Sequence, residues 1–325
     1  MALMGAALQA GRKQKGRPLA GIEPSKSART GERMGDLPRI EERFVEIADV
    51  LTRVLEVPGE GPAILLLHGF SDSADSWRPV LRELAALSRR AVAVDLPGHG
   101  HASPLNHPPL AYLDRFADGF LRTYAGEDGS VVVGNSLGGL VALRAAARRD
   151  VGLLAVAGLG PGGLAYHRRL AYLARALSCL EVSLRLIELL PVPTSVITHA
   201  AAAVYARRLA RGRGDADLAS RYVSHIHGMH GVIRLIRGMI ALDADETHLG
   251  SETLRSIRVP VLLIWGDCDH LADVTGAPIL LDTVPESRLV MLDDCGHCPH
   301  VEFPETVARL LAELPSSAMP GSGST

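Results

Sequence analysis

Short apolar runs alternate along the chain with stretches in which apolar residues recur every three or four positions. The short runs are typical of buried β-strands, and the longer periodicity is typical of amphipathic helices. Strands are predicted at residues 44–50, 52–57, 63–67, 91–94, 130–133, 153–157, 259–265 and 288–292, the first two as an antiparallel pair. Helices are predicted at residues 77–87, 140–147 and 305–314. This alternation predicts a mostly parallel sheet with helices on both faces.

The pattern changes in the middle of the chain. Residues 164–250 contain repeated helical patterns, such as the apolar stripe of Leu170, Leu173, Leu177 and Leu180, and no convincing strand. The sheet pattern resumes with the strand at 259–265. We therefore predict that a helical insertion interrupts a single sheet and lies over its carboxyl edge.

The composition fits a globular protein with a sizeable core, since 47% of the 325 residues are hydrophobic and 22% are charged. The formal net charge of −2 gives no overall attraction to nucleic acid or to an anionic membrane. Residues 1–39 are the exception, because they carry eight Lys or Arg against three Asp or Glu, about +5, which leaves about −7 for the remainder. This segment lacks an apolar period, so we predict a disordered basic extension, with Met34 as a candidate natural start.

Two further features of the sequence indicate the cellular compartment. The basic cluster follows the short apolar start instead of preceding it, which is the wrong order for a secretory signal, and no run approaches the roughly 18–20 apolar residues of a membrane span. The four cysteines are too few for a disulfide scaffold. These observations predict a cytoplasmic protein without a transmembrane segment.

The strongest chemical signal is the pentapeptide Gly134-Asn135-Ser136-Leu137-Gly138. It lies between a predicted strand and a predicted helix, which is the context of a nucleophile elbow, where a strained turn exposes one serine hydroxyl. Glycines are needed on both sides of the serine because side chains there would collide across so tight a bend.

A serine nucleophile needs a base, and the base needs an acid that orients it. The strand at 259–265 is followed by Gly266-Asp267-Cys268-Asp269, and the strand at 288–292 is followed by Asp293-Asp294-Cys295-Gly296-His297. An acid and an imidazole are therefore expected at the same sheet edge as Ser136. Both Asp267 and Asp269 are candidates for the acid.

Five motifs, in this order along the chain, resemble those of the α/β-hydrolase fold superfamily, and in particular its capped serine esterases and lipases. They are Leu67-His68-Gly69-Phe70, Asp95-Leu96-Pro97-Gly98-His99-Gly100, Gly134-Asn135-Ser136-Leu137-Gly138-Gly139, Trp265-Gly266-Asp267-Cys268-Asp269, and Gly296-His297 with Glu302-Phe303-Pro304-Glu305. The resemblance implies an α/β-hydrolase fold, with a mostly parallel eight-stranded sheet, helices on both faces and a helical cap insertion. The expected organisation is a core of residues 40–160 and 251–315, a cap of residues 161–250, the basic extension 1–39 and a flexible tail 316–325.

The resemblance also implies roles for individual residues. Ser136 corresponds to the nucleophile, His297 to the general base and Asp269 to the orienting acid, because the family's acid usually lies at the second acidic position of that turn. Asp267 is the competing choice. The expected oxyanion donors are the backbone N–H groups of Phe70 and Leu137. Substrate is expected near the cap and near two further residues, His68 and Asn135, with no metal and no cofactor.

The expected function is hydrolysis of carboxylic esters of small to medium apolar acyl compounds, through a Ser-His-Asp triad and an acyl-enzyme. Two alternatives stay open. The same triad serves C–C bond, thioester or amide hydrolysis, perhydrolysis or acyl transfer in other proteins, because fold and triad do not settle the substrate. A non-catalytic ligand-binding or receptor protein on this fold is the other alternative. The expected partner is a small-molecule ester and not a nucleic acid, and both a monomer and a homodimer are compatible with the sequence.

Two other motifs are interpreted structurally. Cys295-Gly296-His297-Cys298 matches the Cys-x-x-Cys pattern of redox proteins, but it is expected in a strand-to-helix turn outside a thioredoxin-type fold, so we interpret its cysteines as incidental thiols. The spacing of His225, His227 and His230 fits no standard zinc site, and these histidines are interpreted as cap-packing or surface residues.

Overall fold

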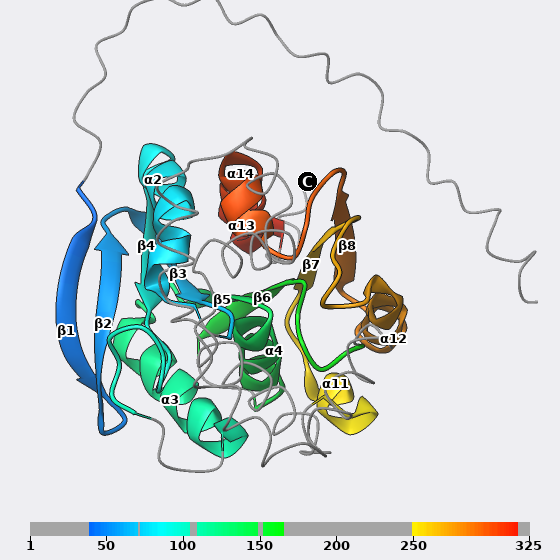
Figure 1. Ribbon diagram of the computed structural model, residues 1–325, viewed down its shortest axis with the longest axis horizontal. Coiled ribbons are helices and arrows are strands. Elements are labelled where there is room, and N and C mark those ends of the chain that lie inside the picture. The colour runs from blue at the N-terminus through cyan, green and yellow to red at the C-terminus, as the bar shows by residue number, and fades with distance from the viewer. Residues whose placement is uncertain (1–38, 71, 105–108, 149–151, 166–248, 318–325) are drawn as a thin grey trace, which may run out of the picture. The chain divides into compact units, whose positions relative to one another are not determined.

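A computed structural model describes residues 39–70, 72–104, 109–148, 152–165 and 249–317. All of them lie in one compact unit, Asp36–Thr325. Among these residues, eight strands form one sheet in the order β1-β2-β4-β3-β5-β6-β7-β8 (Figure 1). Their bounds are β1 Glu41–Ile47, β2 Val50–Val57, β3 Glu60–Leu67, β4 Arg89–Val94, β5 Ser130–Asn135, β6 Leu153–Leu159, β7 Val261–Gly266 and β8 Ser287–Leu292.

The sheet is antiparallel at one end and parallel elsewhere. Strands β1 and β2 form an antiparallel pair, joined by a turn in which Ala48 and Asp49 have positive φ values of 50° and 65°. Strand β2 is also antiparallel to β4, whereas all neighbours from β4 to β8 are parallel. The predicted fold class and the predicted antiparallel pair are confirmed.

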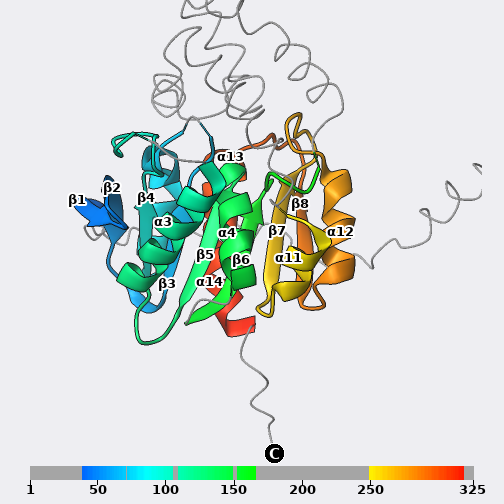
Figure 2. The same ribbon diagram turned by 90° about the horizontal axis from the view of Figure 1, so that it is seen from below.

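Helices cover both faces of the sheet (Figure 2). One face carries α3 (Pro109–Tyr124), α4 (Leu137–Arg148), α11 (Ser251–Ser256) and α12 (Ala277–Thr283), and the other carries α2 (Arg78–Ala86) and α14 (Pro304–Ser317). The short helices η1 (Ala74–Trp77), η2 (Val274–Gly276) and α13 (Pro299–Glu302) lie in connections between these elements.

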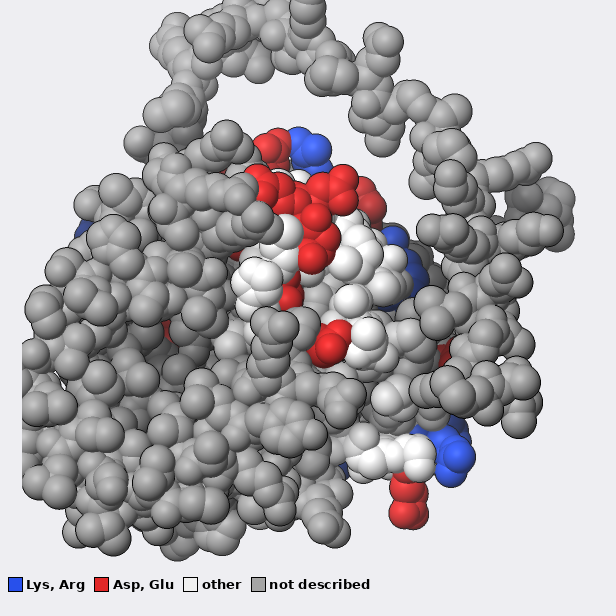
Figure 3. All heavy atoms as spheres, turned by 45° about the vertical axis from the view of Figure 1, so that its right-hand side comes forward, with Lys and Arg blue, Asp and Glu red and all other residues white. Residues whose placement is uncertain are grey.

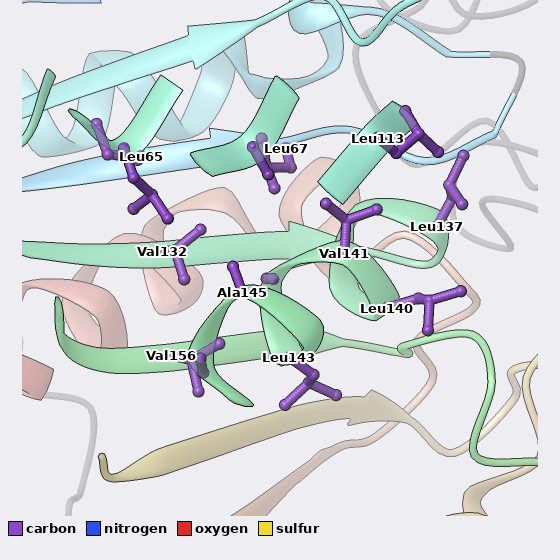
Figure 4. Close-up of a cluster of buried hydrophobic side chains, with 14 of the residues drawn as sticks. Leu65, Leu67, Leu113, Val132, Leu137, Leu140, Val141, Leu143, Ala145 and Val156 are labelled. Carbon is purple, nitrogen blue, oxygen red and sulfur yellow. The ribbon is translucent and has the colours of Figure 1, made fainter. Parts of the chain in front are cut away.

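The two core clusters follow from the alternation of side chains along each strand. In β3, Leu65 and Leu67 face α3 and α4, as Figure 4 shows, whereas Ile64 and Leu66 face α2 and α14. Because successive side chains of a strand point to opposite faces, a strand covered on both sides must be apolar throughout. The continuous apolar runs of the central strands therefore follow from their position in the sheet.

Several boundaries differ from the sequence prediction. The helix predicted at 77–87 begins one residue later, after η1, whose first turn is capped by the Ser73 side chain. Helix α14 continues to Ser317, so residues 316 and 317 belong to the helix and not to the predicted tail. Nearly all of the predicted cap 161–250, with His225, His227 and His230, lies outside the described residues, as does the extension up to residue 38. Within the described part of the chain, the helices are too short or too polar to cross a bilayer.

Candidate active site

The candidate catalytic and oxyanion residues lie directly after strands β3, β5, β7 and β8. These strands run parallel, so their carboxyl ends share one edge of the sheet. In open α/β sheets this edge is where ligands bind. The candidate residues therefore lie at the edge of the sheet where ligands bind in this type of fold.

Ser136 lies in a sharp turn between β5 and α4 and has a φ of 52°, a left-handed conformation that is uncommon for a residue with a side chain. Hydrogen bonds hold this conformation: the Ser136 N–H donates to the Leu159 carbonyl at 3.0 Å, and the Ser136 carbonyl accepts from the N–H groups of Leu140 and Gly162 at 3.0 Å each. A positive φ stabilised by surrounding contacts is the backbone strain expected of a nucleophile elbow.

The glycines on both sides of Ser136 are required by close backbone approaches. A Cβ atom on Gly134 would lie 2.0 Å from the carbonyl carbon of Gly138, and one on Gly138 would lie 2.3 Å from the Leu67 carbonyl oxygen. No side chain fits at these distances. The steric reason given for the two glycines from the sequence therefore holds in the structure.

His297 and Asp269 form a buried pair. The Nδ1 atom of His297 lies 2.8 Å from Oδ2 of Asp269, and each side chain is 2% exposed. The other carboxylate oxygen, Oδ1, accepts hydrogen bonds from the backbone N–H groups of Leu271 at 2.8 Å and Ala272 at 3.0 Å. A carboxylate only accepts, so Nδ1 carries the proton in this pair and Nε2 is the basic nitrogen.

Asp267, the competing acid, has a different position. Its side chain is exposed, and its Oδ1 accepts a hydrogen bond from the Cys295 backbone N–H at 3.2 Å. The Cys268 N–H donates to the Cys295 carbonyl at 2.9 Å, so the loop after β7 is fastened to the loop after β8. Of the two aspartates, Asp269 is the one that contacts the His297 imidazole.

Glu302 also binds the backbone of the loop after β8. Its Oε1 accepts a hydrogen bond from the Gly296 N–H at 2.7 Å. The sequence motif included Glu302 but gave it no role, because the interaction depends on how α13 folds back toward the loop. Its spacing of five residues after His297 was the only available signal.

The turn at Gly69 and Phe70 lies beside the serine. A Cβ atom on Gly69 would lie 3.4 Å from the Ser136 Cβ. Leu137 is the first residue of α4, and the first N–H groups of a helix have no acceptor within the helix. The Phe70 ring is half-buried and packs edge to face on His99, with ring centroids 5.1 Å apart. The backbone segments proposed to carry the oxyanion donors therefore flank the Ser136 turn.

His68 and Asn135 are both buried and bonded to backbone groups. The Nε2 atom of His68 accepts from the Leu96 N–H at 2.9 Å, so its Nδ1 is the donor to the Gly69 carbonyl at 2.7 Å. The side-chain nitrogen of Asn135 donates to the Leu159 carbonyl at 3.0 Å and to the His297 carbonyl at 2.9 Å. These interactions connect the loops of the site to one another.

Asp95 connects the turn after β4 to neighbouring elements. Its buried carboxylate pairs with Arg53 and accepts hydrogen bonds from the N–H groups of Ala74 at 2.7 Å and His101 at 2.9 Å. Burial acts to raise the pKa of Asp95, but the charge of Arg53 and the hydrogen bonds from the Ala74 N–H and the Arg53 side chain outweigh burial and lower the pKa. An ionised Asp95 thereby joins the β4 end to η1.

A third buried histidine, His300, is the second residue of α13. Its ring stacks on Trp77 with centroids 4.3 Å apart, and within the described part of the chain neither of its nitrogens has a hydrogen-bond partner. Burial lowers the pKa of His300 to about 3. His300 is therefore neutral at physiological pH. Cys295 and Cys298 are also fully buried, and both are thiols.

The strand order, the strained serine turn and the paired histidine and aspartate at one sheet edge define the class of protein as an α/β-hydrolase. The chain belongs to the alpha/beta hydrolase family, whose model matches residues 64–310. It is thus a hydrolytic enzyme of the esterase and lipase type.

Several known proteins that resemble the chain are hydrolases. The monoacylglycerol lipase ABHD6 of Mus musculus is 27% identical over 265 residues, which cover 80% of this chain and 77% of that protein. Two solved structures share the fold. A serine hydrolase involved in carbazole degradation, the CarC enzyme, has a TM-score of 0.68 at 22% identity and covers 86% of this chain and 100% of its own. The 2-hydroxy-6-oxo-6-phenylhexa-2,4-dienoate hydrolase of Rhodococcus sp. strain RHA1 has a TM-score of 0.66 at 21% identity. The match covers 85% of this chain and 98% of that protein's chain.

Proposed function

We propose that this enzyme cleaves carboxylic esters of small to medium apolar acyl compounds, with Ser136 as nucleophile, His297 as general base and Asp269 as orienting acid. The observation that carries the proposal is the 2.8 Å contact between His297 Nδ1 and Asp269 Oδ2 at the same sheet edge as the strained Ser136 turn. A serine, a base and an acid in this chain order are the catalytic set of α/β-hydrolases.

In the first step, the Ser136 hydroxyl oxygen attacks the ester carbonyl carbon while Nε2 of His297 takes its proton. Asp269 stabilises the imidazolium that forms, and its two backbone hydrogen bonds keep its carboxylate in place. The negative oxygen of the tetrahedral intermediate accepts hydrogen bonds from the backbone N–H groups of Phe70 and Leu137. The intermediate then collapses, His297 gives its proton to the leaving alcohol, and an acyl-enzyme on Ser136 results.

In the second step, water attacks the acyl-enzyme. His297 takes a proton from the water, the same two N–H groups stabilise the second tetrahedral intermediate, and Ser136 leaves with the proton from His297. The acid product is released and the resting enzyme is restored. Every proton in this cycle moves through His297.

The name of the ABHD6 relative suggests a first natural substrate. That protein is a monoacylglycerol lipase, and its similarity extends over 80% of this chain. A monoacylglycerol combines an apolar acyl chain with a small alcohol, as the proposed substrate class requires. We therefore include monoacylglycerols among the esters to be tested.

The test is a panel of aryl esters of graded acyl length, together with a monoacylglycerol, assayed with the wild-type enzyme and with Ser136→Ala. We expect an optimum acyl length in the wild type and loss of that activity in Ser136→Ala. Ser130→Ala is the matched control, because Ser130 is a buried serine at the opposite end of the same strand. Equal, slow hydrolysis of every ester by wild type and Ser136→Ala would reject the proposal.

A further inference from the structure

The side chain of Asn135 lies where the loops of the candidate site meet. Asn135 is the last residue of β5, directly before Ser136, and it is 1% exposed. Its amide nitrogen lies 3.0 Å from the Leu159 carbonyl oxygen and 2.9 Å from the His297 carbonyl oxygen. One side chain therefore links the strand that carries the nucleophile to the backbone of the base.

Both N–H groups of this amide are engaged. Two carbonyl oxygens face the same side-chain atom, and that atom must be the nitrogen because an amide oxygen cannot donate. The Leu159 carbonyl also accepts the Ser136 N–H at 3.0 Å. The Asn135 side chain and the Ser136 backbone are thus bound to one acceptor at the end of β6.

The amide oxygen faces the third loop. A Cβ atom on Gly69 would lie 3.0 Å from Oδ1 of Asn135, so the oxygen is close to the turn that leads to Phe70. The amide consequently contacts or adjoins the backbone at the end of β6 and in the loops after β3 and β8. A rigid group in this position resists relative movement of those loops.

We propose that Asn135 is a positioning residue, which fixes the distance between the Ser136 hydroxyl and the His297 imidazole through its two hydrogen bonds. The inference rests on the proposed function of those two residues. It differs from a substrate-binding role, because the Asn135 amide is buried and both of its N–H groups are bonded to backbone carbonyls.

Replacement of Asn135 by aspartate isolates this role. The two side chains have nearly the same shape, but a carboxylate has no donor and would present oxygen to both carbonyl groups. The resulting repulsion moves the His297 backbone away from β5. A displacement of about 1 Å at a catalytic group can reduce the rate on the order of 100-fold, and we expect a decrease of that size in kcat with little change in KM.

The experiment uses the full-length chain as wild type, Asn135→Asp, Asn135→Ala, Ser136→Ala and the control Ser130→Ala, and the Tm of each protein is measured. Titration with a fluorophosphonate, carried to its end point, counts active sites, so that kcat refers to folded enzyme alone. We then measure kcat, KM and the pH dependence of kcat/KM with the best aryl ester. The introduced carboxylate of Asn135→Asp should raise the apparent pKa of the base, because a nearby negative charge favours the imidazolium. Asn135→Ala should lose kcat without that pKa shift, and Ser130→Ala should behave as wild type.

The outcomes separate the possible roles of Asn135. A per-site kcat within about twofold of wild type in both Asn135 variants would overturn the inference, and so would a higher KM at unchanged kcat, which indicates contact with substrate. A lower thermal stability with unchanged kcat and pH profile would also overturn it. If Ser136→Ala keeps its activity, the proposed function itself fails. If Ser136→Ala is inactive and the Asn135 variants are normal, only the positioning role fails.

Discussion

Gly160 packs directly against the acid–base pair. It has a φ of 46°, and a Cβ atom there would lie 2.9 Å from Asp269 Oδ2 and 3.3 Å from His297 Nδ1. We expect Gly160→Ala to displace the carboxylate or the imidazole and to lower kcat roughly 10- to 100-fold. The measurement is kcat per active site with an aryl ester.

The control for this prediction separates backbone strain from crowding. Gly152 also has a positive φ, 82°, but the nearest atom to a Cβ at Gly152 is the Gly129 Cα at 3.9 Å. Gly152→Ala should therefore lower the free energy of unfolding by about 1 kcal/mol, through backbone strain alone, and leave kcat unchanged. A kcat decrease of equal size in both variants would contradict the steric explanation.

The two aspartates after β7 should differ strongly in their effects on activity. Asp269 contacts the His297 imidazole, whereas Asp267 accepts a hydrogen bond from the Cys295 backbone. Asp269→Asn presents an amide to His297 and disfavours the required tautomer, so kcat should fall on the order of 1,000-fold or more. Asp267→Asn retains an acceptor oxygen for the Cys295 N–H, so its kcat should fall much less. Assays of both variants side by side decide the assignment, which would be reversed if Asp267→Asn were the more damaged enzyme.

A buried carboxyl group makes the stability depend on pH. Burial raises the pKa of Asp72 to about 7, the charges of Asp95 and Asp75 add to the shift, and hydrogen bonds with Ser73 and Ser76 oppose it. The folded-state pKa is therefore above the ordinary value of 3.8. The stabilisation from neutral Asp72 is complete below about pH 4 and is lost as the pH rises toward about 7.

Asp72→Asn removes this dependence, because the amide stays neutral and keeps an acceptor for the Ser73 N–H. Relative to wild type, the variant should gain stability by a few kcal/mol, at most about 4, between about pH 4 and pH 8. Thermal unfolding of both proteins across this range measures the gain. A stability difference that does not change with pH would show that Asp72 ionises normally.

The residue types of the site could be predicted from the sequence. The hydrogen bonds that hold these residues in place could not. A serine between two glycines after a strand, and an acid and a histidine after later strands, are local patterns. The contacts of Asn135, Asp267 and Glu302 with backbone groups join residues that are distant along the chain or depend on how a loop folds back. Such contacts depend on the exact placement of neighbouring loops, which a sequence pattern does not contain.

At the scale of elements, ion pairs join helix α3 to helix α4, which begins directly after the candidate nucleophile. Arg144 binds Asp114 through Nε at 3.0 Å and Nη2 at 2.6 Å, and these side chains are 14% and 13% exposed. Arg148 lies 2.7 Å from the same carboxylate. Partly buried, bidentate pairs of this kind contribute more than exposed ones.

We expect Arg144→Met to lower the free energy of unfolding by about 1–2 kcal/mol, which corresponds to a few degrees in Tm, with kcat per active site unchanged. The control is Arg309→Met on α14, where Arg309 and its partner Glu305 are 63% and 65% exposed and the ion pair should contribute little. Equal shifts in Tm for the two variants would show that the α3–α4 pairs have no special contribution.

The central strands were easier to predict than the edge strand and the helices, for a physical reason. A strand buried on both faces must be apolar throughout, so the central strands are visible in the sequence. Strand β1 lies at the sheet edge and begins with exposed Glu41, Glu42 and Arg43, which give no apolar signal. Helix α3 was not predicted, although Leu113, Phe116, Phe120 and Tyr124 follow a helical period and are buried.

At the scale of the whole molecule, the parallel sheet brings the candidate residues together. Residues 70, 136, 269 and 297 are far apart along the chain, but each follows a parallel strand, so all lie at one sheet edge. The sequence predicted this convergence because each candidate follows a strand of a sheet that was predicted to be mostly parallel. The substrate-lining side chains were beyond such prediction, since an alternating pattern does not tell which face of a cap helix points into a cavity.

Charge is also distributed unevenly. The remainder of the chain beyond residue 39 carries about −7 by the sequence count. Figure 3, with the side of β8 and α12 turned forward, shows Asp and Glu side chains gathered on the described part of that face. A mildly acidic surface is compatible with an uncharged ester substrate, for which electrostatic steering is not required.

The most direct test of the account is covalent labelling with a fluorophosphonate, followed by intact-mass measurement and peptide mapping. If Ser136 is the activated nucleophile, one label per chain should be found on the peptide that contains Ser136, and ester hydrolysis should decrease in proportion to labelling. Labelling of another residue, or full hydrolysis by enzyme completely labelled at Ser136, would contradict the assignment of Ser136 as the nucleophile.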